Sequence, residues 1–148
     1  DEVALDWPPA SAPPLLAAGE GPKTLALAGQ LADGTVIPSQ WGLERFAAGA
    51  AATRAGAGDR ATEHGVSVFL LTAFGDDRSR HDADLRADLP EADRIVALGS
   101  PEEVAETVAD YLEAGASTVV LQPASTEPDL DGFAAGAGEV AGLLGLRA

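Results

Sequence analysis

The residues best suited to chemistry form one short segment, Ala18-Gly19-Glu20-Gly21-Pro22-Lys23-Thr24. Glycine lets the backbone approach a ligand closely, and free amide groups at the start of a helix attract an anion. Lys23, the only lysine of the chain, and the Thr24 hydroxyl would add a charge and a hydrogen bond. This pattern predicts a phosphate-binding turn. An ordinary strand-to-helix turn is the alternative, because Gly-x-Gly by itself is a weak motif and neither the P-loop nor the full dinucleotide fingerprint is present.

Other polar residues near predicted strand ends are further candidates for ligand binding. Ser39 follows a predicted strand at the rim where barrel enzymes bind ligands, and Trp41 would either stack on a ligand or pack in the core. Gln122 ends another predicted strand and would donate to a ring carbonyl or a phosphate. His64 precedes a strand, at the end opposite this rim, so we assign it no catalytic role.

Nucleophilic and metal chemistry have little support. The chain has no cysteine, which excludes thiolate catalysis, disulfides and cysteine-based zinc sites. Asp76 and Asp77 are typical of a solvated turn, and His81 lies in an acidic loop, so we expect no metal site. No serine elbow or pair of catalytic histidines suggests a hydrolytic triad, and no residue stands out as an acid or base.

Alternating strands and helices must position the glycine turn. Short apolar runs predict strands that are buried on both faces, and apolar residues at helical spacing predict the helices. The first half of the chain is expected to contain a strand at Leu15–Ala18, a helix at Pro22–Ala32, a strand at Thr35–Pro38, a helix at Gly42–Arg54 and a strand at Val66–Thr72.

The second half repeats this alternation. Ser100, Pro101 and Glu103 form a helix start with a capping box, and Ala114-Gly115-Ala116 ends that helix. The remaining expected elements are a loop with a short helix at Phe74–Asp93, an extended piece at Ile95–Leu98, a strand at Thr118–Gln122, a loop at Pro123–Asp131 and a helix at Gly132–Leu146.

The predicted order is β-α-β-α-β-α-β-α, an α/β fold with parallel strands joined by right-handed crossovers. Four such units are half of a (β/α)8 TIM-type barrel. The length of 148 residues predicts one domain or half-domain over residues 1–148. Proline-rich residues 1–13 would form an extended N-terminal arm.

The net charge of the chain limits the classes of partner that it is expected to bind. The net charge is −15, and the nine basic residues are dispersed, which argues against nucleic acid and membrane surfaces as partners. The sequence shows neither a long apolar segment nor a signal peptide, which predicts a cytoplasmic protein. The absence of methionine suggests a processed chain or a fragment of a longer protein, or removal of the initiator alone.

Two stretches carry a family resemblance, PPLLAAGEGPKTLALAGQLADGTVI and GSPEEVAETVADYLEAGASTVVLQP. The first resembles the segment of the bacterial luciferase-like monooxygenases that contains an Ala-Ala-x-Gly-Pro-Lys turn and an Ala-Asp-Gly strand entry. The second resembles the final helix and eighth strand of that family. The likeness runs from Val3 to about Pro123, in the family's order, and implies the C-terminal half, strands five to eight, of a flavin- or deazaflavin-dependent (β/α)8 barrel.

The resemblance also implies a cofactor and its binding residues. Family members use reduced FMN or the deazaflavin coenzyme F-420 and bind its phosphate at the glycine turn after the fifth strand. That turn corresponds here to Ala18, Gly19, Glu20 and Gly21, followed by Lys23. Ser39, at the end of the sixth strand, would lie near the same ligand, whereas Glu20 between the glycines departs from the commonest form of the motif.

Half a barrel leaves two functional hypotheses open. Two edges and one apolar face of a four-stranded sheet would be uncovered. The chain is therefore expected to be the cofactor-phosphate side of a flavin- or F-420-dependent oxidoreductase acting on a small-molecule substrate, completed by a missing N-terminal half. Alternatively, it is a non-catalytic binding or structural half-barrel that pairs with a second copy. A phosphosugar-type barrel enzyme is a third interpretation.

Overall fold

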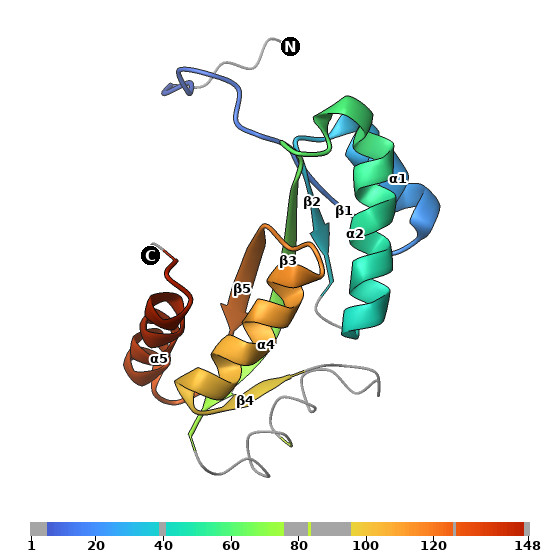
Figure 1. Cartoon of the computed structure of the whole chain (residues 1–148). Helices are drawn as coiled ribbons and strands as arrows, with labels where there is room; N and C mark the ends of the chain where they lie inside the picture. Colours follow the sequence, from blue (N-terminus) through green and yellow to red (C-terminus); the bar gives the residue numbers. More distant parts are fainter. Residues whose placement is uncertain (1–5, 39–40, 76–82, 84–95, 126, 147–148) are drawn as a thin grey trace.

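A computed structural model describes residues 6–38, 41–75, 83, 96–125 and 127–146 of the chain (Figure 1). Strands and helices alternate as the sequence predicts. The elements are β1 (Leu16–Ala18), α1 (Pro22–Leu31), β2 (Gly34–Ile37), α2 (Leu43–Ala57), a 3-10 turn (Gly58–Arg60), β3 (Gly65–Phe74), β4 (Ala97–Gly99), α4 (Pro101–Glu113), β5 (Thr118–Gln122) and α5 (Leu130–Leu143).

The strands form one parallel sheet in which β1, β2, β3 and β5 lie side by side in that order. The strand β3 is central, because its first half pairs with β2 and its middle with β5. Its last three residues, 72–74, pair with β4. We predicted four strands and treated residues 95–98 as a connection. That prediction was incomplete, because β3 runs past the ends of its neighbours and leaves backbone groups that only another strand can pair.

Helices cover one face of the sheet. Val66, Val68 and Leu70 alternate along β3 toward this side and are buried. They share a core with Phe46 of α2 and Val104 of α4, among other residues. The helices α1, α2 and α4 of the described connections therefore lie on the same side of the sheet, as in one sector of a (β/α)8 barrel.

The helices α1 and α2 lie side by side (Figure 1), and glycine permits their close approach. A Cβ at Gly29 would overlap the Thr53 carbonyl oxygen, and one at Gly56 would overlap the Ala26 carbonyl oxygen. Arg60 then donates to the carbonyls of Gly29, Gln30 and Ala32. These bonds satisfy acceptors that the end of α1 leaves free.

The helix starts differ in how they are capped. The predicted capping box at α4 is confirmed, since the Ser100 side chain accepts from the Glu103 amide and the Glu103 carboxylate accepts from the Ser100 amide. Asp129 caps α5 by accepting from the Gly132 amide. In contrast, α1 follows Gly21, which has no side chain to cap it.

The opposite face of the sheet and its two outer strands are poorly covered. Leu15 and Leu16 beside and within β1 are 64% and 54% exposed, and Phe69 in the central strand is 37% exposed. We predicted that the strands would be buried on both faces. That is wrong for β1 and for Phe69 on the inner face of β3, because no second layer of the described chain covers them. Farther along the same face, Leu71 and Ala73 are buried in a small cluster with Ala124.

Several boundaries shift by a few residues. α2 continues to Ala57, past the predicted end at Arg54, and α5 begins at Leu130 rather than Gly132. Residues 6–13 contain neither helix nor strand and are exposed. Most of the predicted loop at 74–93 lies outside the described residues. No helix within the described part of the chain is long and apolar enough to cross a membrane.

Candidate functional site

The glycine turn lies where β1 becomes α1, at the carboxyl ends of the parallel strands. Gly21 is the N-cap of α1 in an extended conformation, and Pro22 occupies the first helical position. A Cβ at Gly19 would lie 3.0 Å from Thr24 Cγ2, so this residue must be small, whereas a Cβ at Gly21 would meet only Thr24 Oγ1, at 3.8 Å. The start of α1 is therefore open, close to the Thr24 hydroxyl, and free of a side-chain cap.

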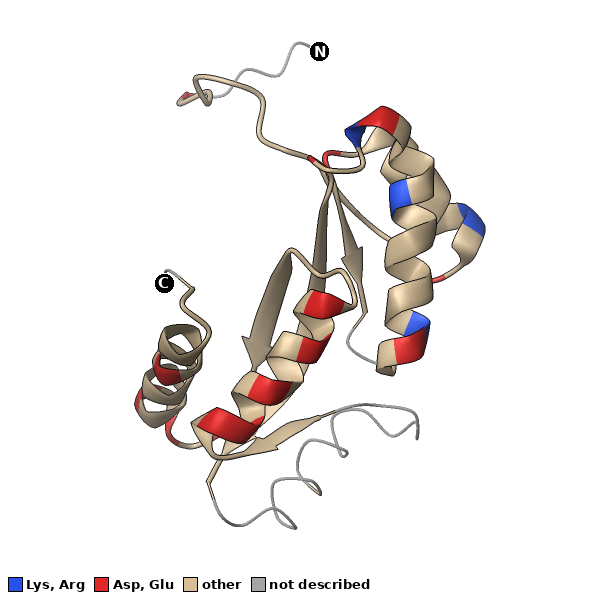
Figure 2. Cartoon of the chain, in the orientation of Figure 1, with Lys and Arg blue, Asp and Glu red and all other residues tan. Residues whose placement is uncertain are grey.

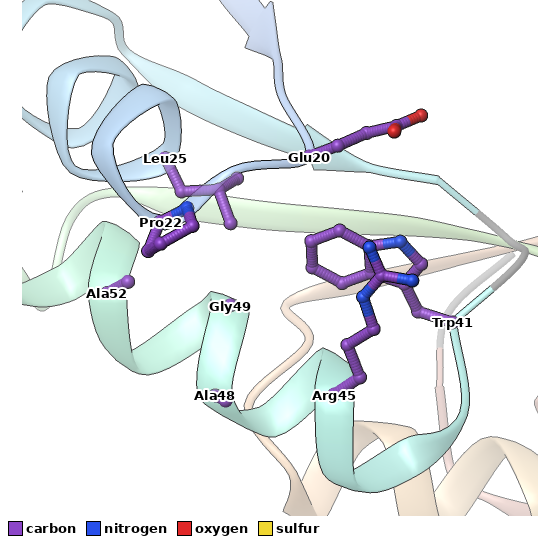
Figure 3. Close-up of a pocket in the computed structure, with 8 residues that line it drawn as sticks. All are labelled: Glu20, Pro22, Leu25, Trp41, Arg45, Ala48, Gly49 and Ala52. Carbon is purple, nitrogen blue, oxygen red and sulfur yellow. The ribbon is translucent and has the colours of Figure 1, made fainter.

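The charged residues of the turn flank this helix start. Figure 3 shows the Glu20 side chain extending away from Pro22 and Leu25. Lys23 is exposed in the first turn of α1. A lysine here opposes the helix dipole, so its position favours an anion that would neutralise it.

A pocket of about 260 Å³ adjoins the turn and separates the start of α1 from α2 (Figure 3). Pro22 and Leu25 line one side, and residues of α2 line the other. The Arg45 guanidinium lies 4.1 Å from the centroid of the Trp41 ring, a cation–π contact at the mouth of the pocket. Sequence reasoning did not single out Arg45, because an arginine in a first helical turn is ordinarily a solvated residue.

Trp41 packs in the core rather than presenting a free ring face. It is 2% exposed, and a Cβ at Gly49 would lie 2.8 Å from its Cζ3. The Tyr111 hydroxyl donates to the Trp41 carbonyl at 3.0 Å, and burial raises the pKa of Tyr111 to about 12. These contacts decide between the two roles that the sequence left open for Trp41, in favour of packing.

The other predicted rim residues are only partly brought together. Ser39 lies outside the described residues, so its place beside the turn stays a prediction. Gln122 is exposed at the end of β5. A second pocket of about 300 Å³, lined by Phe74 and the acidic Glu127 and Asp129, lies at the end of β3. Its acidic lining does not suit a phosphate.

His64 lies at the amino-terminal end of the sheet, as predicted. It is buried, and its Nε2 lies 2.9 Å from Thr35 Oγ1. Burial lowers the pKa of His64, and the charge of Arg60 lowers it further, while Asp33 acts in the opposite direction. This neutral histidine joins β2 to the chain before β3 and lies far from the rim. Among the described residues, no cluster of acidic or histidine side chains could hold a metal ion.

Sequence comparisons identify no relative. No protein-family model matches the chain, and no curated protein sequence is significantly similar to it.

Structural comparisons, in contrast, give clear matches. An F-420-dependent secondary alcohol dehydrogenase, solved with an F-420–acetone adduct, is 16% identical with a TM-score of 0.68, over 89% of this chain and 50% of that protein. The F-420-dependent tetrahydromethanopterin reductase of Methanopyrus kandleri is 18% identical with a TM-score of 0.63, over 90% and 51%. The EDTA monooxygenase of Chelativorans sp. BNC1 is 15% identical with a TM-score of 0.64, over 93% and 45%.

The chain has the fold of the luciferase-like barrel proteins. The predicted resemblance is thereby confirmed at the level of the fold, and so are the parallel sheet and the alternating order. The chain spans about half the length of these structural neighbours.

Proposed function

We propose that this chain is the C-terminal, cofactor-phosphate half of a flavin- or F-420-dependent oxidoreductase of the luciferase-like type. The observation that carries the proposal is the uncapped start of α1 behind Gly19 and Gly21, at the carboxyl ends of the parallel strands. The neighbours that are F-420-dependent or monooxygenases support the same kind of activity.

The residues of the turn fit an anionic cofactor tail. The amides of the first turn of α1 point out of the helix and attract a phosphate. Gly21 leaves room for close approach, since Thr24 Oγ1 at 3.8 Å is the only atom near its missing Cβ. Lys23 supplies a positive charge in the same turn, and the Glu20 side chain extends away from Pro22 and Leu25 (Figure 3). Both FMN and F-420 carry a phosphate, so the turn suits either cofactor.

The redox chemistry, hydride transfer or monooxygenation, would come from the bound cofactor. The chain's own task is to hold the phosphate, which fixes the cofactor at the rim of the barrel. Thr24 and Lys23 would bind the phosphate oxygens, and Ser39 is proposed to lie against the same ligand. We assign no described side chain at this rim the role of a catalytic acid or base. Proton transfer and recognition of the small-molecule substrate are therefore assigned to the surfaces that complete the barrel.

Completion of the barrel is part of the proposal. The described chain provides strands for one half only, and its inner face exposes Leu16 and Phe69. Either the N-terminal half of a longer protein or a second copy of this chain would cover that face. A non-catalytic half-barrel that pairs with a second copy is the second candidate, because the exposed apolar residues of the inner face would be covered in that case too.

Binding of FMN compared with riboflavin tests the proposed phosphate site. The two ligands share the ring system and differ by the phosphate, so FMN is expected to bind about tenfold more tightly, as one charge-assisted contact to a phosphate allows. Quenching of flavin fluorescence measures both affinities, and absorbance titration does so for F-420.

Lys23→Gln provides the variant for this test, with Glu106→Gln on the far face of α4 as the control for a changed charge. Lys23→Gln is expected to remove most of the preference for FMN, and the control is expected to retain it. Equal binding of FMN and riboflavin by the unaltered chain, or no saturable binding of FMN and F-420, would refute the proposal.

A further inference from the structure

Two apolar surfaces lie at opposite edges of the sheet. At the β1 edge, an apolar groove of about 190 Å³ lies between the strand and α1, and its lining includes Leu15, Ala17, Leu27 and Leu31. No charged side chain lines this groove. Leu27 and Leu31 are 51% and 74% exposed, so the described chain does not fill it.

The opposite edge carries a helix that lacks a partner on most of its surface. Only Gly136 and Val140 of α5 are buried, although the helix has just two charged residues, Asp131 and Glu139. Leu130 and Leu143 are 61% and 55% exposed. Exposed alanines and glycines between them give a narrow apolar helix, which suits a groove lined by small and branched residues.

The strands at the two edges of the sheet run in the same direction. Among the described residues, β1 pairs only with β2, and β5 pairs only with β3, both in parallel. Rotation of a second copy by half a turn about an axis along the strands would bring β5 of each copy beside β1 of the other, still in parallel. The helix α5 of one copy would then lie beside α1 of the other, over the groove.

The length of the chain relative to its structural neighbours is consistent with such a pair. The chain matches 45–51% of three luciferase-like neighbours, so two copies together have the length of one complete barrel. The charges of α5 are few, because only Asp131 and Glu139 are acidic, and the residues that line the groove are uncharged. The acidic residues of α4 are exposed on the face of α4 seen in Figure 2. One copy would bury the apolar edges that the other exposes.

We propose that a second copy of this chain closes the barrel, with α5 of each copy seated in the groove between β1 and α1 of the other. The inference rests on the barrel closure proposed above and is independent of the cofactor. It names the partner that the exposed surfaces accept.

Analytical ultracentrifugation of the unaltered chain without cofactor gives the first test. The expected species at micromolar concentrations has twice the 14.9 kDa mass of one chain. A monomer at tens of micromolar, or an open-ended series of larger species, would overturn the proposal. Because no cofactor is present, failure here leaves the FMN and riboflavin comparison unaffected, and loss of FMN binding leaves this result unaffected.

A pair of variants tests the seating of the helix. Leu31 and Leu143 lie in the last turns of α1 and α5, and both helices run antiparallel to the strands, so these turns lie at the same end of the barrel. Leu31→Glu and Leu143→Lys are each expected to weaken self-association by at least about tenfold, as expected for an apolar contact replaced by a desolvated charge. Trp7→Glu, which changes a 92% exposed residue of the arm, is the matched control and is expected to have no effect.

Mixing the two variants separates this arrangement from any other dimer. In the mixed pair, one junction keeps both leucines and the other joins the introduced glutamate to the introduced lysine, so association is expected to return. Circular dichroism of each variant checks that it is folded. Unchanged association of the single variants, or no recovery on mixing, would show that α5 does not occupy the groove.

Discussion

At the scale of single residues, a substitution of Gly21 distinguishes a ligand-binding role of the glycine turn from a purely structural role. The backbone angles of Gly21, φ −91° and ψ 148°, are accessible to alanine, and the nearest atom to an added Cβ is 3.8 Å away. Gly21→Ala is therefore expected to change the melting temperature little, because alanine restricts the unfolded chain but is a poorer N-cap than glycine. The methyl group would stand at the helix start, and FMN affinity is expected to fall about tenfold, as for loss of one phosphate contact.

Gly138→Ala is the control for this variant. Gly138 lies in α5 with no atom within 4 Å of an added Cβ, so alanine should stabilise the chain by about 0.5–1 kcal/mol without changing FMN affinity. Thermal unfolding and fluorescence titration on the same samples measure both quantities. A large loss of stability in Gly21→Ala, with affinity retained, would make the turn purely structural.

The lowered pKa of a second residue, His64, leads to a prediction of how the free energy of unfolding depends on pH. The pKa of His64 is lowered in the folded chain, first by burial and then by the charge of Arg60, from an ordinary value of 6.5. The unfolded chain therefore binds more protons than the folded chain as the pH drops below 6.5, so this contribution to stability is present above that pH and is lost below it.

Urea unfolding at pH 7.5 and 5.5 measures this effect. His64→Gln keeps a polar partner near Thr35 Oγ1 but does not titrate, so its free energy of unfolding is expected to change less between the two pH values. His81 is present in both proteins, so its contribution to the pH dependence of stability cancels in the comparison. An identical pH dependence in the two proteins would rule out His64 as its source.

At the scale of elements, the contact between α1 and α2 determines the geometry of the site. The pocket beside the glycine turn lies between these helices, and Gly29 and Gly56 set their separation through contact with Thr53 and Ala26. Gly29→Ala forces a methyl group against a backbone carbonyl, which cannot rotate away. The expected loss is about 3 kcal/mol, the upper end of the cost of overpacking.

Denaturant unfolding of Gly29→Ala and Gly56→Ala measures this loss, and Gly142→Ala in α5, with no atom within 4 Å of an added Cβ, is the control. The same variants should weaken FMN binding if they remain folded, because a wider α1–α2 spacing moves the helix start relative to Arg45. Stability equal to that of the unaltered chain would show that the helices adjust freely and do not fix the site.

At the scale of the whole molecule, charge opposes compactness. The net charge of −15 is distributed over 148 residues, and one face of α4 is lined with acidic residues (Figure 2). Salt screens this self-repulsion, since the Debye length falls to about 10 Å at 0.1 M. The melting temperature is therefore expected to rise between 20 and 300 mM sodium chloride.

Differential scanning calorimetry at a fixed protein concentration measures the shift, and potassium chloride should reproduce it because screening depends on ionic strength. A lower melting temperature in salt would mean that favourable ion pairs outweigh the repulsion. The same screening should tighten self-association, which sedimentation at the two salt concentrations would show.

The sequence alone determined the local structure of this protein. Apolar runs and helical spacing predicted the order of strands and helices, Ser100 with Glu103 predicted a capping box, and Pro22 after the glycine turn predicted the start of a helix. These features depend on a few consecutive residues, because capping, backbone freedom and hydrophobic periodicity act over one or two turns. The family resemblance was visible in the same short segments.

Only the tertiary structure decided the roles that depend on distant residues. It paired β4 with the end of β3, packed Trp41 under the Tyr111 hydroxyl, and placed Arg45 over the Trp41 ring. It also showed that β1 is exposed, although its sequence is as apolar as that of a strand buried on both faces. Burial depends on what the rest of the chain provides as a covering layer, and the apolar residues of one short strand do not record whether such a layer is present.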